Sequence, residues 1–108
     1  MGFQVIKQPS GKLAIFSTET DTWACWDGSA EEVVDWFVDR ASAGERERVQ
    51  RVVAAVQEDK PRKVYYQFAM TFAEANAHSK HHGGDVLEGP LDEGLLAELE
   101  RPLDDPEP

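Results

Sequence analysis

The sequence predicts an α+β domain in which helices cover one face of a mainly antiparallel sheet. Two observations lead to this fold class. Apolar residues alternate with a period of two near the start of the chain and again at 64–70, whereas in the segments between and after them they recur at helical spacing. Short connections join the first three apolar segments, which favours antiparallel neighbours. The expected order is β-β-β-α-α-β-α: a three-stranded meander plus a fourth strand, with about three helices.

Three strands are expected in the first quarter of the chain. The segment FQVIKQ (3–8) alternates as a strand does, and PSGK (9–12) supplies the proline and glycine of a turn. LAIFST (13–18) reads as the second strand. TWACWD (22–27) reads as the third, because it is rich in the bulky residues that suit a half-buried pleated surface.

Two helices are expected next. Ser29 and Glu32 have the spacing of a capping box, in which the hydroxyl and the carboxylate each bond a free backbone amide of the first turn. Apolar residues at helical spacing follow: Val33, Val34, Trp36, Phe37 and Ala41. Gly44 interrupts the pattern, and a second stripe comprises Val49, Val52, Val53 and Val56. The interruption favours two packed helices over one kinked helix.

A fourth strand and a third helix complete the predicted domain. VYYQFAM (64–70) restores the period of two and is expected to join the sheet. Thr71 and Glu74 form a second capping-box signature, so a helix is expected from there to Gly83, which suits a left-handed helix end.

The charge of the chain is distributed unevenly. The net charge is −10 overall, and residues 85–108 contribute −8 of it, with nine acidic side chains against Arg101 alone. Residues 1–84 hold twelve acidic and ten basic side chains, or −2. We therefore predict a nearly neutral single domain at 1–84. An acidic, proline-containing tail follows at 85–108, with one short helical turn near 92–100.

Composition limits the cellular setting. One cysteine, Cys25, excludes an internal disulfide and favours a reduced compartment. No apolar run approaches the roughly 18–20 residues needed to cross a bilayer, and the start of the chain lacks the layout of a secretory signal. We expect a cytoplasmic protein with no membrane partner.

The three histidines lie within five positions near the end of the third predicted helix: His78, His81 and His82. Two imidazoles one turn apart can share a metal ion, so a surface zinc or nickel site is one interpretation, with Glu74 as a further ligand. The other is a solvated helix end, where cationic side chains are favoured by the helix dipole and Glu74 closes the capping box. We favour the second interpretation and expect no cofactor.

No arrangement of residues typical of an active site occurs in the sequence. Cys25 lies between Trp23 and Trp26 and lacks the base and the electropositive surroundings of a nucleophile, so a buried structural thiol is expected. There is no phosphate-binding glycine loop, nucleophile elbow or zinc-ribbon cysteine pair. We expect a non-enzymatic protein.

A basic strip is predicted on the second helix and the segment after it. It comprises Arg46, Arg48, Arg51, Lys60, Arg62 and Lys63. Acidic residues are interleaved, so one interpretation is a helix surface crossed by ordinary ion pairs. The other is contact with the phosphates of a nucleic acid, or with an acidic protein segment such as the tail of this chain.

The tail carries an apolar stripe at helical spacing. It comprises Leu91, Leu95, Leu96 and Leu99, and is expected to dock on its own domain or on a second copy. Together with the aromatic strands and the lack of catalytic parts, it predicts a small accessory or regulatory protein that acts through protein–protein contacts as a homodimer. The alternatives are a nucleic-acid-associated regulator using the basic strip, and an inhibitor imitating DNA with its acidic surface.

Overall fold

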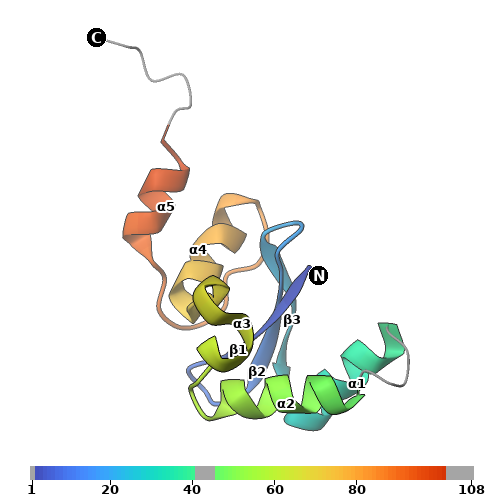
Figure 1. The fold of residues 1–108 in the computed structure, drawn as a ribbon. Coiled ribbons are helices and arrows are strands. Elements are labelled where there is room, and N and C mark those ends of the chain that lie inside the picture. Colours follow the sequence, from blue (N-terminus) through green and yellow to red (C-terminus); the bar gives the residue numbers. More distant parts are fainter. Residues whose placement is uncertain (1, 41–45, 102–108) are drawn as a thin grey trace.

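The computed structural model describes residues 2–40 and 46–101. The chain begins with an open sheet of three antiparallel strands in the order β1-β2-β3 (Figure 1). They are β1 (Phe3–Lys7), β2 (Leu13–Ser17) and β3 (Thr22–Gly28). The central strand β2 pairs with β1 and with β3, so the predicted meander and the α+β class are confirmed.

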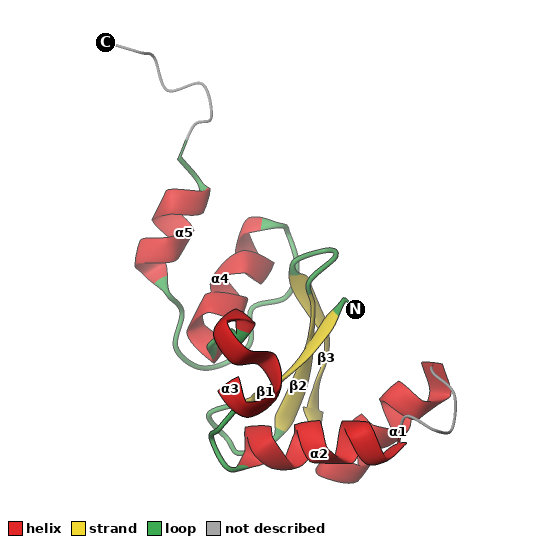
Figure 2. Cartoon of the chain, in the orientation of Figure 1, coloured by secondary structure: helices red, strands yellow, loops and turns green. Residues whose placement is uncertain are grey.

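Helices make up most of the remaining described chain (Figure 2). They are α1 (Ala30–Arg40), α2 (Arg46–Gln57), α3 (Arg62–Tyr65), the 3-10 helix η2 (Tyr66–Phe68), α4 (Phe72–His81) and α5 (Glu93–Leu99). Within the described residues, no helix has both the length and the apolar character needed to span a membrane.

Both predicted capping boxes are present. At the start of α1, the Glu32 N–H donates to the Ser29 hydroxyl (3.1 Å) and the Ser29 N–H donates to the Glu32 carboxylate (2.9 Å). Thr71 and Glu74 make the same two bonds, also at 2.9 and 3.1 Å, at the start of α4. Each box bonds backbone amides that the first helical turn leaves without a partner, and so sets where its helix begins.

The sheet is covered on both faces, whereas the sequence analysis expected helices on one. Side chains of alternate strand residues point to opposite faces. Val5, Leu13 and Ile15 pack against the valines of α1 and α2. Ile6, Ala14, Phe16 and Trp23 form a second core with Phe72 and Ala75 of α4. The expectation of one covered face was wrong because both strand faces are apolar, and each needs a cover.

The predicted fourth strand at 64–70 was also wrong. These residues form the end of α3, then η2, and pass along β1 without extending the sheet. Tyr66 has φ +55°, which breaks an extended chain. Side chains make the contacts that a strand backbone would have made: the Val5 N–H donates to the Tyr65 hydroxyl at 2.9 Å. Gln4 donates to the Phe68 carbonyl (2.7 Å) and accepts from the Met70 N–H (3.2 Å).

The segment after α4 is bonded to the body of the protein. The buried Asn76 amide accepts from the Leu87 N–H (2.8 Å) and donates to the carbonyls of Leu87 (2.9 Å) and Pro90 (3.2 Å). Leu87 belongs to the core on the α4 side of the sheet. The domain boundary at residue 84 stays a prediction, but the residues just after it contribute to the core. The short helix α5 lies in the region 92–100 where a helical turn was expected.

Candidate functional site

The residues of the predicted basic strip are all exposed, but they do not share one helix. Arg46, Arg48 and Arg51 lie on α2, Lys60 follows α2, and Arg62 and Lys63 lie on α3. Arg46 pairs with Asp35 of α1 at 3.2 Å, as an ordinary helix-surface ion pair does. The strip is therefore a set of bases spread over two helices and interleaved with acids.

Two exposed aromatic side chains lie next to the bases of α3. Tyr66 is 68% exposed and Phe68 is 72% exposed, although the sequence analysis expected them in the sheet. Tyr65 accepts a hydrogen bond from the Val5 N–H of β1, and the Gln4 side chain of β1 bonds the backbone of Phe68 and Met70. These bonds fix the chain on both sides of the two aromatic residues. Tyr66 has a positive φ, which residues other than glycine rarely adopt. The backbone conformation that places its ring outside the core is therefore strained.

These two aromatics line an apolar cavity of about 550 Å³. Its other lining residues are Phe3, Gln4, Thr18, Val64, Tyr65 and Met70, and we call this cavity with Tyr66 and Phe68 the aromatic surface. Apolar residues that project beside an apolar hollow are typical of a protein contact site. The sequence analysis missed this surface, because the period of two at 64–70 predicted that Tyr66 and Phe68 would join the sheet.

Tyr65 joins this surface to the bases of α2. Burial raises the pKa of its hydroxyl above the ordinary value of 10.0. The hydrogen bond from Val5 and the charge of Arg48 act in the opposite direction with smaller effect. Arg48 therefore lies close enough to Tyr65 to act on it electrostatically.

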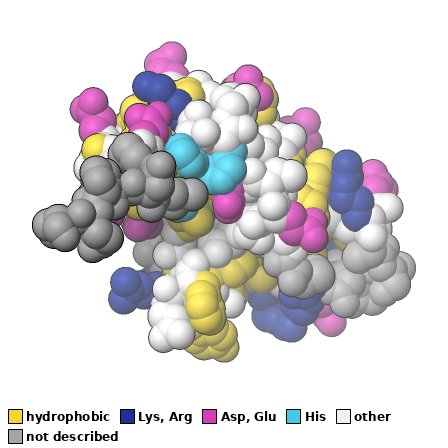
Figure 3. Space-filling model, turned by 90° about the horizontal axis from the view of Figure 1, so that it is seen from above, with side chains coloured by type: hydrophobic (Ala, Val, Ile, Leu, Met, Phe, Trp, Pro, Cys, Tyr) yellow, Lys and Arg dark blue, Asp and Glu magenta, His cyan; other side chains and the backbone are white. Residues whose placement is uncertain are grey.

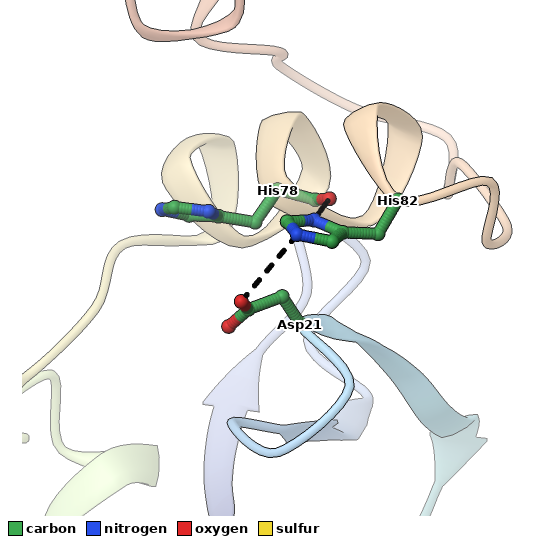
Figure 4. A group of neighbouring side chains, drawn as sticks. All are labelled: Asp21, His78 and His82. Carbon is green, nitrogen blue, oxygen red and sulfur yellow. Dashed lines mark hydrogen bonds and ion pairs between the residues drawn. The ribbon is translucent and has the colours of Figure 1, made fainter. Parts of the chain in front are cut away.

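The histidines are divided by the structure. His78 and His82 lie one turn apart at the end of α4, next to Asp21 of the β2–β3 turn (Figure 4). His81 is exposed and does not belong to this group, and Glu74 is engaged in its capping box. Seen from above, the histidines gather on one face beside an acidic side chain (Figure 3). Sequence reasoning missed Asp21, because nothing local marks a turn residue that meets a helix more than fifty positions later.

The leucine stripe faces α4. Leu96 is buried, while Leu91, Leu95 and Leu99 are half-buried. The Asp92 N–H donates to the Ala73 carbonyl at 3.1 Å, and the Asp92 side chain caps α5 by accepting from the Leu95 N–H at 3.0 Å. Leu96 is therefore buried within its own chain, and a contact of the half-buried leucines with a second copy stays a prediction.

Cys25 is half-buried on β3 and packs against the core formed with α1 and α2. Burial raises the pKa of its thiol above 9.0, and the smaller effects of the Arg40 charge and of a backbone hydrogen bond at Ile15 lower it. A raised pKa reduces the thiolate that a nucleophile needs. The thiol that was expected to be buried is half-buried, and its structural role stays a prediction.

These features define an α+β protein with a small open sheet between two helical layers, and an aromatic surface along one sheet edge. No protein-family model, curated protein or solved structure matches the chain.

Proposed function

We propose that this protein is a small non-enzymatic accessory protein that acts through protein–protein contacts, and that it pairs with a second copy of itself through the aromatic surface. The observation that supports the proposal is the exposure of Tyr66 and Phe68 beside an apolar cavity on the same face. A two-fold dimer brings identical patches together, so a patch must be complementary to itself. Here the projecting rings of one copy meet the hollow of the other.

Charge favours this face over a second cavity of similar size, next to Trp26. That cavity, of about 630 Å³, lies beside Trp26 and Val86 and is lined by three carboxylates: Asp27, Asp85 and Glu88. Two copies of it would place six carboxylates in one interface, where like charges repel. The lining of the aromatic surface carries no charged side chain. A protein with a net charge of −10 can therefore self-associate there with less repulsion than at the acidic cavity.

Sedimentation equilibrium of the full chain tests the proposal. We expect a reversible dimer whose dissociation constant rises at least about tenfold in Phe68→Ser, because exposed aromatic anchors dominate such interfaces. Tyr66→Gly should weaken the dimer similarly. Its folding stability should be unchanged or higher, since glycine relieves the positive φ.

Val86→Ser is the matched control, because Val86 is an apolar residue 50% exposed at the acidic cavity. It should leave the dimer unchanged. A wild-type chain that stays monomeric up to about 1 mM would overturn the proposal. So would an equal loss of association in Val86→Ser and Phe68→Ser.

A second candidate is single-stranded nucleic-acid binding, favoured by the exposed bases Arg62 and Lys63, which precede the two exposed aromatics by a few positions in the chain. Bases of a nucleic acid stack on such rings, and the phosphates contact the cations. Fluorescence anisotropy with a labelled oligothymidylate at low salt tests it. We expect binding that falls steeply with salt and is lost in Arg62→Ala with Lys63→Ala. Failure to bind at low salt excludes it.

A further inference from the structure

Three potential metal ligands from distant parts of the chain converge at the C-terminal end of α4. His78 and His82 come from the helix, and Asp21 comes from the β2–β3 turn. One ligand atom from each lies within 4.8 Å of the other two. The His82 Nε2 and an Asp21 carboxylate oxygen are 3.7 Å apart (Figure 4). Asp21 has φ +56°, which aspartate tolerates better than most residues.

The hydrogen bonding of His82 orients its ring as a ligand. Its Nδ1 lies 2.9 Å from the carbonyl oxygen of His78. A carbonyl can only accept, so in the neutral imidazole Nδ1 carries the proton and Nε2 carries the lone pair. That lone pair is on the nitrogen that lies near Asp21. Metal-binding histidines commonly donate their second ring N–H to a carbonyl in this way, which fixes the tautomer.

The ring of His78 has a nitrogen with no partner. Its Nδ1 is buried and makes no hydrogen bond to any described residue. A buried polar atom without a partner is costly and is uncommon in folded proteins. The ring is therefore not held by a protein donor or acceptor at that atom, and it can reorient to ligate.

The helix end favours a cation. His78 and His82 lie at the last turn of α4, where unpaired carbonyl groups concentrate partial negative charge. The carboxylate of Asp21 adds a full negative charge. The partial charges of the carbonyl groups and the charge of Asp21 both attract a cation placed between the three side chains.

We propose that Asp21, His78 and His82 bind a divalent first-row transition-metal ion, with zinc as the probe. Two imidazole nitrogens and one carboxylate oxygen are ligands that such ions accept, and three protein ligands leave a coordination position open. Bond lengths of about 2.0–2.1 Å on a tetrahedral ion put ligand atoms roughly 3.3 Å apart. The half-exposed side chains reach that spacing from 4.8 Å by small rotations.

Binding would join the β2–β3 turn to the end of α4. Because the unfolded chain does not hold these residues together, an ion that binds only the folded form stabilises it. The site shares no residue with the aromatic surface, so it can be tested independently of the proposed dimer.

Isothermal titration calorimetry of the untagged full chain with zinc chloride is the direct test. We expect one ion per chain, a melting temperature raised by zinc, and affinity reduced at least about tenfold in Asp21→Asn, His78→Ala and His82→Ala. His81→Phe is the matched control, since His81 lies outside the group and phenylalanine keeps the edge-on contact of its ring with His82 (centroids 4.8 Å apart) while removing both ring nitrogens. It should bind as the wild type does. With cobalt in place of zinc, a ligand-field absorption band should appear in the wild type and in His81→Phe only.

Two results would overturn the proposal. The first is zinc affinity that Asp21→Asn leaves unchanged, because the ion would then be held by exposed histidines alone. The second is zinc affinity that His81→Phe lowers as much as His78→Ala does, which would indicate adventitious binding along the helix. The melting curve of each variant without metal separates a loss of ligand from a loss of fold.

Discussion

Asn76 connects three parts of the chain through one fully buried amide group. Its side-chain oxygen accepts from the Trp23 indole N–H (3.0 Å) and from the Leu87 N–H, while its nitrogen donates to two carbonyls beyond α4. Buried polar groups are tolerated when they are hydrogen-bonded, and this one uses both donors and both lone pairs. Asn76 therefore holds β3, α4 and the segment after α4 together.

The change Asn76→Asp should be strongly destabilising for its size. It removes both donors and places a buried negative charge next to two carbonyl oxygens. We expect a loss of at least about 3 kcal/mol in the free energy of unfolding, measured by urea denaturation. Gln67→Glu makes the same chemical change at an exposed amide and should stay within about 0.5 kcal/mol of the wild type. Equal effects of the two changes would contradict the role given to Asn76.

Cys25 gives a pH-dependent prediction. Since its pKa is raised above 9.0 in the folded protein, the inflection of its alkylation rate with pH should lie above that of the chain unfolded in denaturant. Because the pKa is higher in the folded than in the unfolded protein, the protonated thiol stabilises the fold below pH 9. This contribution to the free energy of unfolding is lost as the pH rises through the folded pKa. Arg40→Ala should move the inflection further upward, because the Arg40 charge lowers this pKa. An inflection at or below that of the unfolded chain would contradict the burial argument.

The free edge of β1 is covered by the Tyr65 side chain and by the backbone of residues 68–70. An exposed strand edge is a template for pairing with another chain, and proteins commonly cover it. The Tyr65 hydroxyl takes the place of a strand carbonyl by accepting from the Val5 N–H, and Gln4 bonds the backbone on either side of Ala69. This cover limits growth of the sheet while leaving Tyr66 and Phe68 in solvent.

Tyr65→Phe tests that cover. The change removes one oxygen and leaves the Val5 amide, in a nearly fully buried residue, without its acceptor. We expect a loss of about 1–3 kcal/mol in the free energy of unfolding and faster exchange of the Val5 amide hydrogen. Tyr66→Phe removes the same oxygen from an exposed ring and should be nearly neutral. If both variants unfold alike, the Tyr65 hydroxyl does not hold the edge.

Elements with local signals were predictable from the sequence, and contacts between distant segments were not. The turn at 9–12 and both capping boxes depend on residues within a few positions, and each is present. Apolar residues alternate at 64–70 as they do in a strand, yet Tyr66 adopts a positive φ. Hydrogen bonds that involve the side chains of Tyr65 and Gln4 connect this segment to β1 in place of a strand ladder. For the metal cluster, the spacing of His78 and His82 was visible, whereas Asp21 is brought to them only by the tertiary fold.

The acidic C-terminal segment is partly structural. The charge of −8 over residues 85–108 suggested an appendage, but Leu87 lies in a core and α5 packs through Leu96. The backbone of Asp85 also accepts from the buried Ser79 hydroxyl, and the Trp23 N–H donates to that same hydroxyl at 3.3 Å. A few apolar and hydrogen-bonding positions therefore decide how this segment packs, and the charge composition does not.

Two truncations separate the structural part of this segment from the rest. A chain ending at residue 91 keeps Leu87 and both carbonyls bonded by Asn76, and loses Leu96. A chain ending at residue 84 loses all three Asn76 bonds to the segment and the apolar area of Leu87. Removing a buried leucine costs about 2–5 kcal/mol, and each unpaired buried polar group costs about 1–3 kcal/mol more. We expect the chain ending at 91 to fold with reduced stability, and the chain ending at 84 to show no cooperative unfolding transition by circular dichroism. If the chain ending at 84 melts as cooperatively as the full chain, the domain ends at residue 84, and the bonds of Asn76 to the segment after α4 contribute little to the fold.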